Sequence, residues 1–251
     1  MFLFLILNKN NWLWYITLTL LVLDIETVPA SPDFQHLPDY WKGLWEDKMS
    51  KTMPENFSHT EWYAQRAGIL AEFGKIICIS TGCFYQDANG ETGFRLKSLS
   101  GDDEKKLLLD FLGILHTFRD KRNTVILAGH NIKEFDIPYI CRRLMIHHVA
   151  LPEMLQLSAK KPWETNMLDT MELWKFGDYK NYISLNLLAA VLGIETPKDD
   201  IDGSMVRDVY YREHDLQRIA VYCQKDVVTV ANIILRFKSL PLLDKEHIVI
   251  S

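Results

Sequence analysis

The stretch LVLDIET, residues 21–27, decides the fold, because an apolar run ends there in two closely spaced acids. Asp24 and Glu26 are two positions apart, and in a strand such residues project on the same side of the chain. Two carboxylates this close repel each other unless one is protonated or a cation lies between them. Divalent cations such as Mg²⁺ prefer oxygen ligands of this kind. The stretch therefore predicts either the metal-binding end of a buried strand or a solvated strand end at which a loop begins.

The apolar residues before Asp24 reach back almost to Met1 and raise the question of a membrane segment. A signal peptide carries positive charge ahead of its apolar core, whereas Lys9 follows the first apolar run. A spanning helix needs about 20 apolar residues, and polar residues 8–11 interrupt this run. Its aromatic and β-branched residues favour a strand.

We therefore expect a buried strand over residues 15–25 and no stable membrane association, with a membrane anchor as the alternative. Residues 1–14 form an apolar N-terminal extension, which is either a preceding hairpin strand or an over-extended start of the reading frame.

The composition is that of an ordinary globular protein. Of the 251 residues, 48% are hydrophobic and 24% are charged, and the formal net charge is -5. This balance argues against a protein that binds nucleic acid by bulk charge alone, but it is compatible with an acidic site that holds cations. The four cysteines form no C-x-x-C pair and are expected to be free thiols in a reducing, cytoplasmic compartment.

The remaining pattern predicts strands and helices around one sheet. Ser58 and Glu61 fit a capping box that starts a helix to about residue 71. We expect an α/β fold with a mixed central sheet flanked by helices. It forms one domain over residues 15–240, with an inserted segment at about 29–73 and a tail at 241–251. The other expected elements are strands over 75–81, 93–99 and 123–131, helices from 102 or 103 and over 137–147, 184–192 and 215–237, a helix or strand-then-helix over 166–176, and an acidic loop over 196–203.

Two further acids occur at informative positions. Asp136 follows Phe135 in GHNIKEFDIPYI, residues 129–140, directly before a helix that Pro138 suits. Taken alone, Asp136 is most simply a helix N-cap. Asp226 lies on an otherwise apolar helix face in VYCQKDVVTV, residues 221–230, and Tyr222 shares that face four residues earlier. A buried Asp226 needs a partner, whereas an exposed one would pair with a nearby basic residue.

Taken together, the three motifs resemble those of a known enzyme family. LDIET, HNIKEFDIPYI and YCQKD are similar, in this order, to the three motifs of the DEDD 3′–5′ exonucleases in their tyrosine-containing branch. The second motif, with Arg142 and Arg143 after it, is especially similar to the proofreading domain of B-family DNA polymerases. From about residue 21 to about 237, the chain resembles a stand-alone bacterial group of predicted exonucleases related to that domain.

This resemblance implies a ribonuclease H-like fold and two divalent cations, Mg²⁺ or Mn²⁺. It implies that Asp24 bridges the ions, that Glu26, Asp136 and Asp226 complete their shells, and that Tyr222 orients the attacking water. The implied substrate is single-stranded nucleic acid, with DNA favoured over RNA. The implied substrate-binding residues are Thr27, Asn131 and Phe135, although Phe135 is also compatible with a place in the core.

Other residues have weaker claims to a functional role. Trp41 and Trp45 would form either a stacking platform or internal packing, and Asp169 either lies near the site or caps a helix. Five basic residues would meet a nucleic-acid backbone or belong to the ordinary charged surface: Arg142, Arg143, Lys160, Lys161 and Lys175.

Two alternatives to a DNA exonuclease remain open. The first is an exoribonuclease on the same scaffold, because a fold alone does not fix the substrate. The second is a non-catalytic nucleic-acid-binding module, which would not need the complete set of acids and Tyr222.

Overall fold

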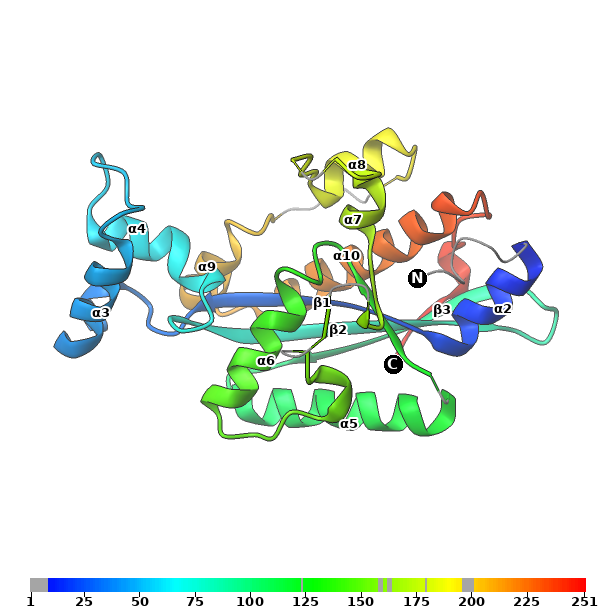
Figure 1. Ribbon diagram of the computed structural model, residues 1–251, viewed down its shortest axis with the longest axis horizontal. Coiled ribbons are helices and arrows are strands. Elements are labelled where there is room, and N and C mark those ends of the chain that lie inside the picture. The colour runs from blue at the N-terminus through cyan, green and yellow to red at the C-terminus, as the bar shows by residue number, and fades with distance from the viewer. Residues whose placement is uncertain (1–8, 123, 158–159, 162–163, 179, 196–200) are drawn as a thin grey trace.

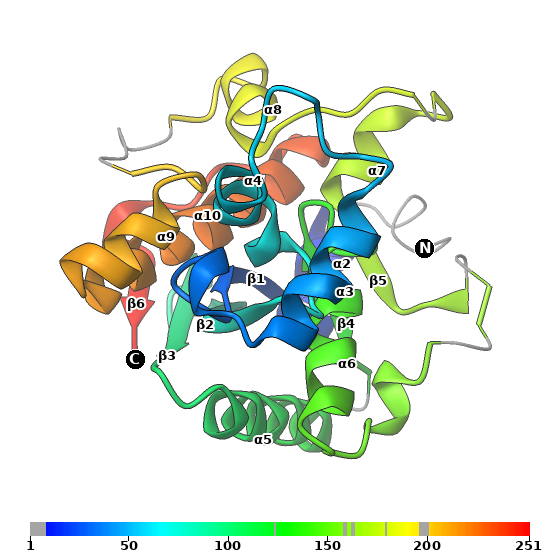
Figure 2. The same cartoon turned by 90° about the vertical axis from the view of Figure 1, so that its left-hand side faces the viewer.

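The computed structural model describes residues 9–122, 124–157, 160–161, 164–178, 180–195 and 201–251, and it shows a mixed sheet with helices on both faces (Figures 1 and 2). The strands are β1 Leu20–Pro29, β2 Gly74–Gln86, β3 Thr92–Ser100, β4 Ile126–Gly129, β5 Met167–Asp169 and β6 Ile248–Ile250. The helices are α2 Lys9–Thr19, α3 Asp39–Met49, α4 His59–Arg66, α5 Glu104–Arg122, α6 Asp136–Ile146, α7 Thr170–Lys175, α8 Leu185–Val191, α9 Val206–Asp208 and α10 Leu216–Phe237.

The sheet has six strands in the order β5-β4-β1-β2-β3-β6. Strand β2 is antiparallel to both β1 and β3, whereas β4 pairs parallel with β1, and β5 parallel with β4. Strand β1 is therefore central and has neighbours of both directions. This arrangement confirms the expected α/β fold with a mixed central sheet.

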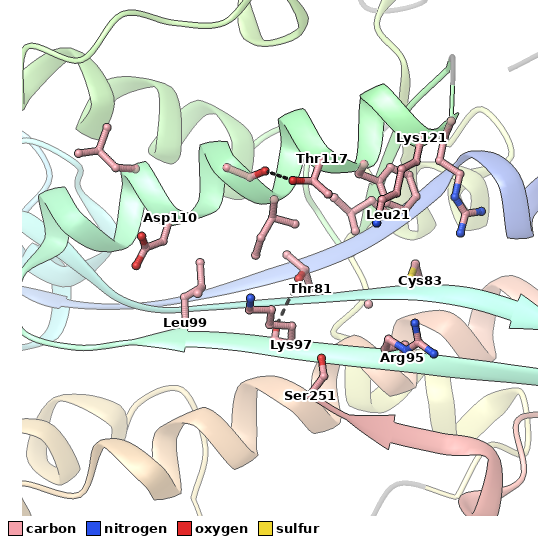
Figure 3. A pocket seen from close by; sticks show the side chains of 16 residues that line it. Leu21, Thr81, Cys83, Arg95, Lys97, Leu99, Asp110, Thr117, Lys121 and Ser251 are labelled. Atoms are coloured by element: carbon pink, nitrogen blue, oxygen red, sulfur yellow. Dashed lines mark hydrogen bonds between the residues drawn. The ribbon is translucent and has the colours of Figure 1, made fainter.

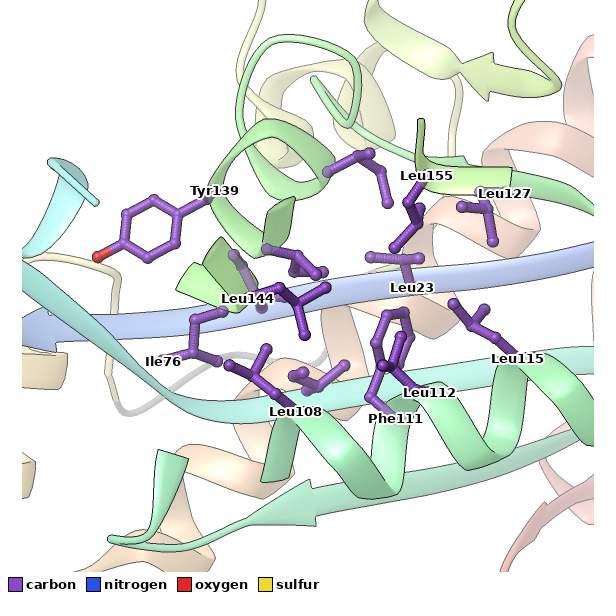
Figure 4. Close-up of a cluster of buried hydrophobic side chains, with 14 of the residues drawn as sticks. Leu23, Ile76, Leu108, Phe111, Leu112, Leu115, Leu127, Tyr139, Leu144 and Leu155 are labelled. Atoms are coloured by element: carbon purple, nitrogen blue, oxygen red, sulfur yellow. The ribbon is translucent and has the colours of Figure 1, made fainter. Parts of the chain in front are cut away.

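Alternating residues of β1 feed two apolar cores, one on each face of the sheet. Leu21, Leu23 and Ile25 pack with α5 and α6, where Phe111 and Leu115 are almost fully buried (Figure 4). Leu20 and Val22 instead pack with α2 and α10. In Figure 1, α5 lies below the sheet and α10 above it. Burial on both faces explains why β1 reads as a continuous apolar run.

The N-terminal prediction is wrong in one respect, because residues 15–19 belong to helix α2 and the strand begins only at Leu20. Trp12 and Ile16 are spaced as helix neighbours and are buried in the cluster that also holds residues of β1, β2 and α10. This packing overrides the strand preference of the β-branched and aromatic residues nearby. Residues 1–8 of the expected extension lie outside the described residues. In the part that the structure describes, no helix combines the length and the apolar character needed to cross a membrane.

The inserted segment is more regular than its sequence indicates. It contains α3 and α4, which lie together at one end of the molecule (Figure 1). The predicted capping box is present, since the Ser58 hydroxyl accepts from the Glu61 amide and the Glu61 carboxylate accepts from the Ser58 amide at 2.9 Å. Helix α4 ends at Arg66, earlier than expected, and a 3₁₀ turn follows.

The later helices and strands are of the predicted type, but they begin and end at other residues than expected. Residues 166–176 form strand β5 and then helix α7, and Asp215 caps the last helix. Part of the expected acidic loop, residues 196–200, lies outside the described residues. The expected C-terminal tail contributes β6, which pairs parallel with β3 from Phe94 to Leu96.

Candidate active site

Strand β1 extends beyond its neighbour β4, and this offset creates the site. Strand β4 pairs with β1 only as far as Val22, whereas Asp24 and Glu26 pair with Ser80 and Cys78 of β2. The pairing register between β1 and β2 shifts only after Glu26. Asp24 and Glu26 therefore still point to the same face of the sheet. Their side chains lie on the face that α10 covers, opposite to Leu23 and Ile25. The apolar run is thus a buried strand whose end presents two carboxylates.

The chain that leaves β4 passes over the part of β1 that has no partner in β4, and it begins α6 at Asp136. Gly129 is required at the crossing, because a Cβ there would lie 2.8 Å from the Cβ of Ile132 and 3.0 Å from the Leu23 carbonyl oxygen. Asn131 then adopts a left-handed conformation with φ of 62°, which asparagine tolerates better than most residues. The crossing brings the Asp136 carboxylate to the Ile25 amide, which donates to it.

Asp169 holds this crossing loop in place. Its Oδ1 accepts from the Asn131 amide at 3.0 Å and its Oδ2 from the Lys133 amide at 3.2 Å. The same carboxylate caps α7 by accepting from the Met171 amide at 2.9 Å. The alternative of a helix cap is therefore confirmed for Asp169, and the cap also fixes the loop that leads to Asp136.

Helix α10 supplies the third side of the site. Cys223 and Asp226 are three positions apart and share a helix face, and Tyr222 precedes them. The Cys223 thiol donates to Oδ2 of Asp24 at 3.3 Å and to the Asp24 carbonyl oxygen at 3.4 Å. This contact fixes α10 against β1, and it lies directly beside the acids.

The acids perturb one another strongly, which shows that they share one electrostatic environment. Burial raises the pKa of Asp24 well above its ordinary value, and the charges of Asp136, Glu26 and Asp226 raise it further. Burial also raises the pKa of Glu26, with a contribution from Asp226. For Asp136, burial raises the pKa to about 7 against the lowering effect of its own amide and that of Ile25. The structure thus brings together all four predicted carboxylates.

The arrangement fits a bound cation. Ligand atoms of Asp24, Glu26 and Cys223 all lie within 4.8 Å of one another. The Asp136 side chain is buried, and its Oδ1 has no hydrogen-bond partner in the described part of the chain. A buried carboxylate oxygen needs a partner, and hard divalent cations take oxygen ligands. Mg²⁺ or Mn²⁺ therefore suits the carboxylates better than it suits the soft thiol of Cys223.

The three predicted substrate-binding residues lie around the acids in different settings. Thr27 follows Glu26 on β1 and hydrogen-bonds the Tyr139 hydroxyl through its side chain. Phe135 precedes Asp136 and is half-buried, with its ring centroid 5.5 Å from that of Tyr139. Asn131 is half-buried in the crossing loop. Part of each residue is therefore accessible, although Thr27 and Phe135 also have structural contacts.

The other candidates separate clearly into buried and exposed residues. Arg143 is buried, and its Nε donates to Glu104 at 2.8 Å, so it is not available to a nucleic-acid backbone. Trp45 is fully buried, whereas Trp41 is 41% exposed. Arg142, Lys160 and Lys161 are exposed, and the Lys175 ammonium lies 4.2 Å from the Tyr182 ring centre.

Sequence reasoning missed the role of Cys223. The residue was expected only to be a free thiol, which it is. Its contact with Asp24 joins residues 199 positions apart in the chain. Its position three residues before Asp226 was the only available sign that it faces the acids.

The comparisons with known proteins agree with this geometry. A family described as predicted 3′–5′ exonucleases related to the exonuclease domain of PolB matches residues 69–246. That range contains Asp136, Tyr222 and Asp226 but begins after Asp24 and Glu26, which the structure joins to them through β1. None of the curated protein sequences matches the chain.

Among solved structures, the family B DNA polymerase from the hyperthermophilic archaeon Pyrobaculum calidifontis has a similar fold. The TM-score is 0.53 at 12% identity, and the match covers 84% of this chain and 23% of the polymerase chain. The present chain thus spans less than a quarter of that polymerase. At this identity the likeness concerns the fold alone, and it confirms the expected ribonuclease H-like sheet.

Proposed function

Because the chain belongs to the family of predicted 3′–5′ exonucleases related to the exonuclease domain of PolB, we propose that it is a metal-dependent exonuclease acting on the 3′ end of single-stranded DNA. The observation that carries the proposal is the convergence of Asp24, Glu26, Asp136 and Asp226 from β1, α6 and α10. Four mutually repelling carboxylates, of which Glu26 and Asp136 are buried and Asp24 and Asp226 half-buried, destabilise a fold unless they serve a charged ligand.

The four carboxylates would hold two Mg²⁺ or Mn²⁺ ions. When bound, two such ions supply an activated water and neutralise the charge that develops on the leaving 3′-oxygen. Asp24 is suited to contact both ions, because Asp136, Glu26 and Asp226 all act on it electrostatically. The raised pKa values of Asp24 and Glu26 mean that a nearby cation would favour their charged forms.

The remaining residues would orient groups rather than hold ions. In this proposal the Tyr222 hydroxyl hydrogen-bonds the attacking water and thereby fixes its direction of attack. The Cys223 thiol holds Asp24, and the Ile25 amide holds Asp136. Thr27, Asn131 and Phe135 would contact the terminal nucleotides, with the exposed part of the Phe135 ring packing on a base.

A cleavage assay tests this proposal directly. A 5′-labelled single-stranded oligonucleotide is incubated with Mg²⁺, Mn²⁺ or EDTA, and stepwise shortening from the 3′ end is expected with either metal only. Asp226→Asn and Tyr222→Phe should each lower the rate, Asp226→Asn by at least about 100-fold. Asp120→Asn, an exposed acid on α5, is the matched control and should retain full activity. The absence of cleavage of DNA and RNA by folded protein with both metals would refute the proposal.

The same assay separates the alternatives. Matched DNA and RNA oligonucleotides show which sugar is preferred, and faster RNA cleavage would identify an exoribonuclease. Binding of either strand without cleavage would identify a non-catalytic module. The complete set of acids, with Tyr222 beside them on α10, supports catalysis over binding alone.

A cytoplasmic location remains part of the proposal. Its support is that Cys78, Cys83, Cys141 and Cys223 are all free thiols, as is usual in a reducing compartment. Cell fractionation followed by detection of the protein would test it.

A further inference from the structure

A cavity of about 770 Å³ lies between α5 and strands β2 and β3 (Figure 3). Lys97 and Arg95 of β3 line it and pair with Thr81 and Cys83 of β2. Thr81 in turn pairs with Leu23, whose side chain points toward α5. Because side chains of paired residues share a face, the cavity opens on the face of the sheet opposite to Asp24.

The charge of this cavity is unlike that of the whole chain, whose net charge is -5. Arg95 and Lys97 from β3 and Lys121 and Arg122 from the end of α5 form its basic lining, and we call this cavity the basic groove. Its single acidic side chain, that of Asp110, is already bound by the Lys106 ammonium. Within the described residues, none of the four cations pairs with a carboxylate. Four unneutralised cations create a positive potential that attracts anions.

Both arginines of the basic groove are supported by aromatic rings. The Arg95 guanidinium lies 5.4 Å from the centre of the Tyr85 ring, and the Arg122 guanidinium lies 5.2 Å from that of Phe118. Stacking of this kind leaves the N–H edge of a guanidinium free to bind oxygens, and the planar fork matches phosphate. Apolar lining residues that are at least partly exposed, among them Leu99 and Leu109, offer surface for sugars or bases.

The thiol of the basic groove is not its reactive feature. Cys83 lines the groove, but burial raises its pKa, and Arg122 and Arg95 only partly oppose this effect. A thiol whose pKa is raised is a poor nucleophile at neutral pH. The groove is therefore suited to binding and not to covalent chemistry.

Two further cavities lie between Tyr222 and the basic groove around the edge of the sheet. A cavity of about 280 Å³ is lined by Tyr222 and by Val221 and Lys225. Val221 and Lys225 also line a cavity of about 570 Å³ that extends to Ile250 of β6. On the other face Ser251, the next residue, lines the basic groove. The three cavities therefore follow one another from Tyr222 over the C-terminal strand to Lys97 and Arg95.

We propose that the basic groove is a second, non-catalytic binding site for the phosphate backbone of single-stranded nucleic acid. It would hold the part of the strand that lies 5′ of the nucleotides at the acids, after the strand has passed over β6. The choice of nucleic acid as the polyanion rests on the proposed function. The charge and depth of the groove rest only on the residues that line it.

Binding without cleavage tests the proposal independently of catalysis. Anisotropy of a fluorescent single-stranded oligonucleotide of about 30 nucleotides is measured in EDTA over a series of salt concentrations. The Arg95→Glu/Lys97→Glu variant should bind at least about tenfold more weakly than the wild type, and the slope of log K against log salt should become shallower by about 1.4 for two lost contacts. Lys97→Ala/Lys121→Ala is a milder variant that should shift both quantities in the same direction.

The matched control is Lys51→Glu/Arg119→Glu, which makes the same change in net charge at two exposed residues outside the groove. Equal loss of affinity in this control would overturn the proposal, as would unchanged binding and slope in the groove variants when circular dichroism shows that they are folded. Binding of a polyglutamate peptide by the wild type, with no binding of the oligonucleotide, would assign the groove to an acidic protein partner instead.

A kinetic readout separates this proposal from the proposed function. The Arg95→Glu/Lys97→Glu variant should raise KM for the long oligonucleotide at least about tenfold while leaving the hydrolysis of a dinucleotide unchanged. Equal effects on both substrates would overturn the groove assignment. If the wild type hydrolyses neither substrate, the proposed function fails, and the anisotropy measurements in EDTA still decide on the groove.

Discussion

At the scale of single residues, the site is defined by carboxylates whose pKa values are raised by burial and by one another, as for Asp24, Glu26 and Asp136. Asp136 is the clearest case, because burial raises its pKa to about 7 from an ordinary value of 3.8. The folded state therefore holds a proton on Asp136 at pH values where the unfolded chain has released it. Between these two pKa values, the unfolded state gains stability relative to the folded state as the pH rises.

We accordingly expect the metal-free protein to lose thermal stability as the pH rises from about 4 to about 7, and to change little from this cause above that. Asp136→Asn should reduce this dependence without abolishing it, because Asp24 and Glu26 titrate in the same direction. Mg²⁺ or Mn²⁺ should restore stability at neutral pH. Thermal unfolding in EDTA at a series of pH values measures the effect, and identical pH profiles for wild type and Asp136→Asn would contradict it.

Cys223 offers a second test at this scale, because its thiol is a donor to Asp24. Cys223→Ala removes the donor, and we expect the rate of oligonucleotide cleavage and the affinity for Mn²⁺ to fall by about tenfold. Cys223→Ser retains a donor and should lose less. Cys141→Ala, a half-buried cysteine that donates to the Leu155 carbonyl instead, serves as the control. Equal activity of Cys223→Ala and wild type would show that the thiol does not position Asp24.

The candidate site shows what sequence can supply at the residue scale. The acids and Tyr222 were identified from motif order, and the structure brings the acids together, while their catalytic roles remain predictions. Cys223 was not identified as part of the site, and for Asp169 a place near the site and a helix cap were left as alternatives. Their contacts, with Asp24 and with the Asn131 amide, join distant positions that only the folded chain brings together.

At the scale of elements, the length difference between β1 and β4 matters most. Gly129 ends β4 where the chain must pass close to β1. Gly129→Ala would place a Cβ at 2.8 Å from that of Ile132 and so displace the loop that carries Asp136. We expect a loss of thermal stability and at least a tenfold loss of cleavage, about the scale of a misplaced catalytic group.

Gly43→Ala is the matched control for this substitution. Gly43 lies within α3 with nothing within 4 Å of its added Cβ, so alanine should be neutral or stabilising there. Both variants are compared by thermal unfolding and by cleavage rate. A Gly129→Ala protein as active and as stable as Gly43→Ala would show that the crossing loop tolerates the displacement.

Element types were more predictable than their limits. The strongly periodic α5 and α10 and the capped α4 were predicted from local signals that act within one turn. The start of β1 was predicted wrongly, because Trp12 and Ile16 are buried in a cluster formed largely by residues far away in the sequence, from β2 and α10. Strand β6 was missed for a similar reason, since three residues have no strand signal without β3 beside them.

At the scale of the whole molecule, a buried ion pair ties the outer helices to the sheet. Arg143 of α6 donates to Glu104 of α5, and Glu104 also accepts from the Ile76 amide of β2 at 2.7 Å. Arg143→Met would leave the buried Glu104 with only His147 and the Ile76 amide as partners, and it should lower the free energy of unfolding by up to about 3–5 kcal/mol. Urea denaturation measures this change.

The double variant Glu104→Leu/Arg143→Met distinguishes an ion pair from simple packing. Removing both charges should recover part of the lost stability, since no buried charge then remains unpaired. If the double variant is less stable than Arg143→Met, the loss of stability in Arg143→Met does not come from the buried charge of Glu104. From the sequence alone, Arg143 was a candidate for contact with a nucleic-acid backbone. The burial of Arg143 by α5 and β2 could not be predicted, because it depends on the complete fold.

The central position of β1 has a consequence for anyone who would isolate a minimal folded fragment. A fragment limited to residues 69–246, the range that the family matches, would lack β1 and β6. Strands β2 and β4 are both partners of β1, so the fragment would carry two half-sheets with unpaired inner edges. Such edges pair with those of other molecules, and the fragment should therefore aggregate instead of folding as a smaller domain.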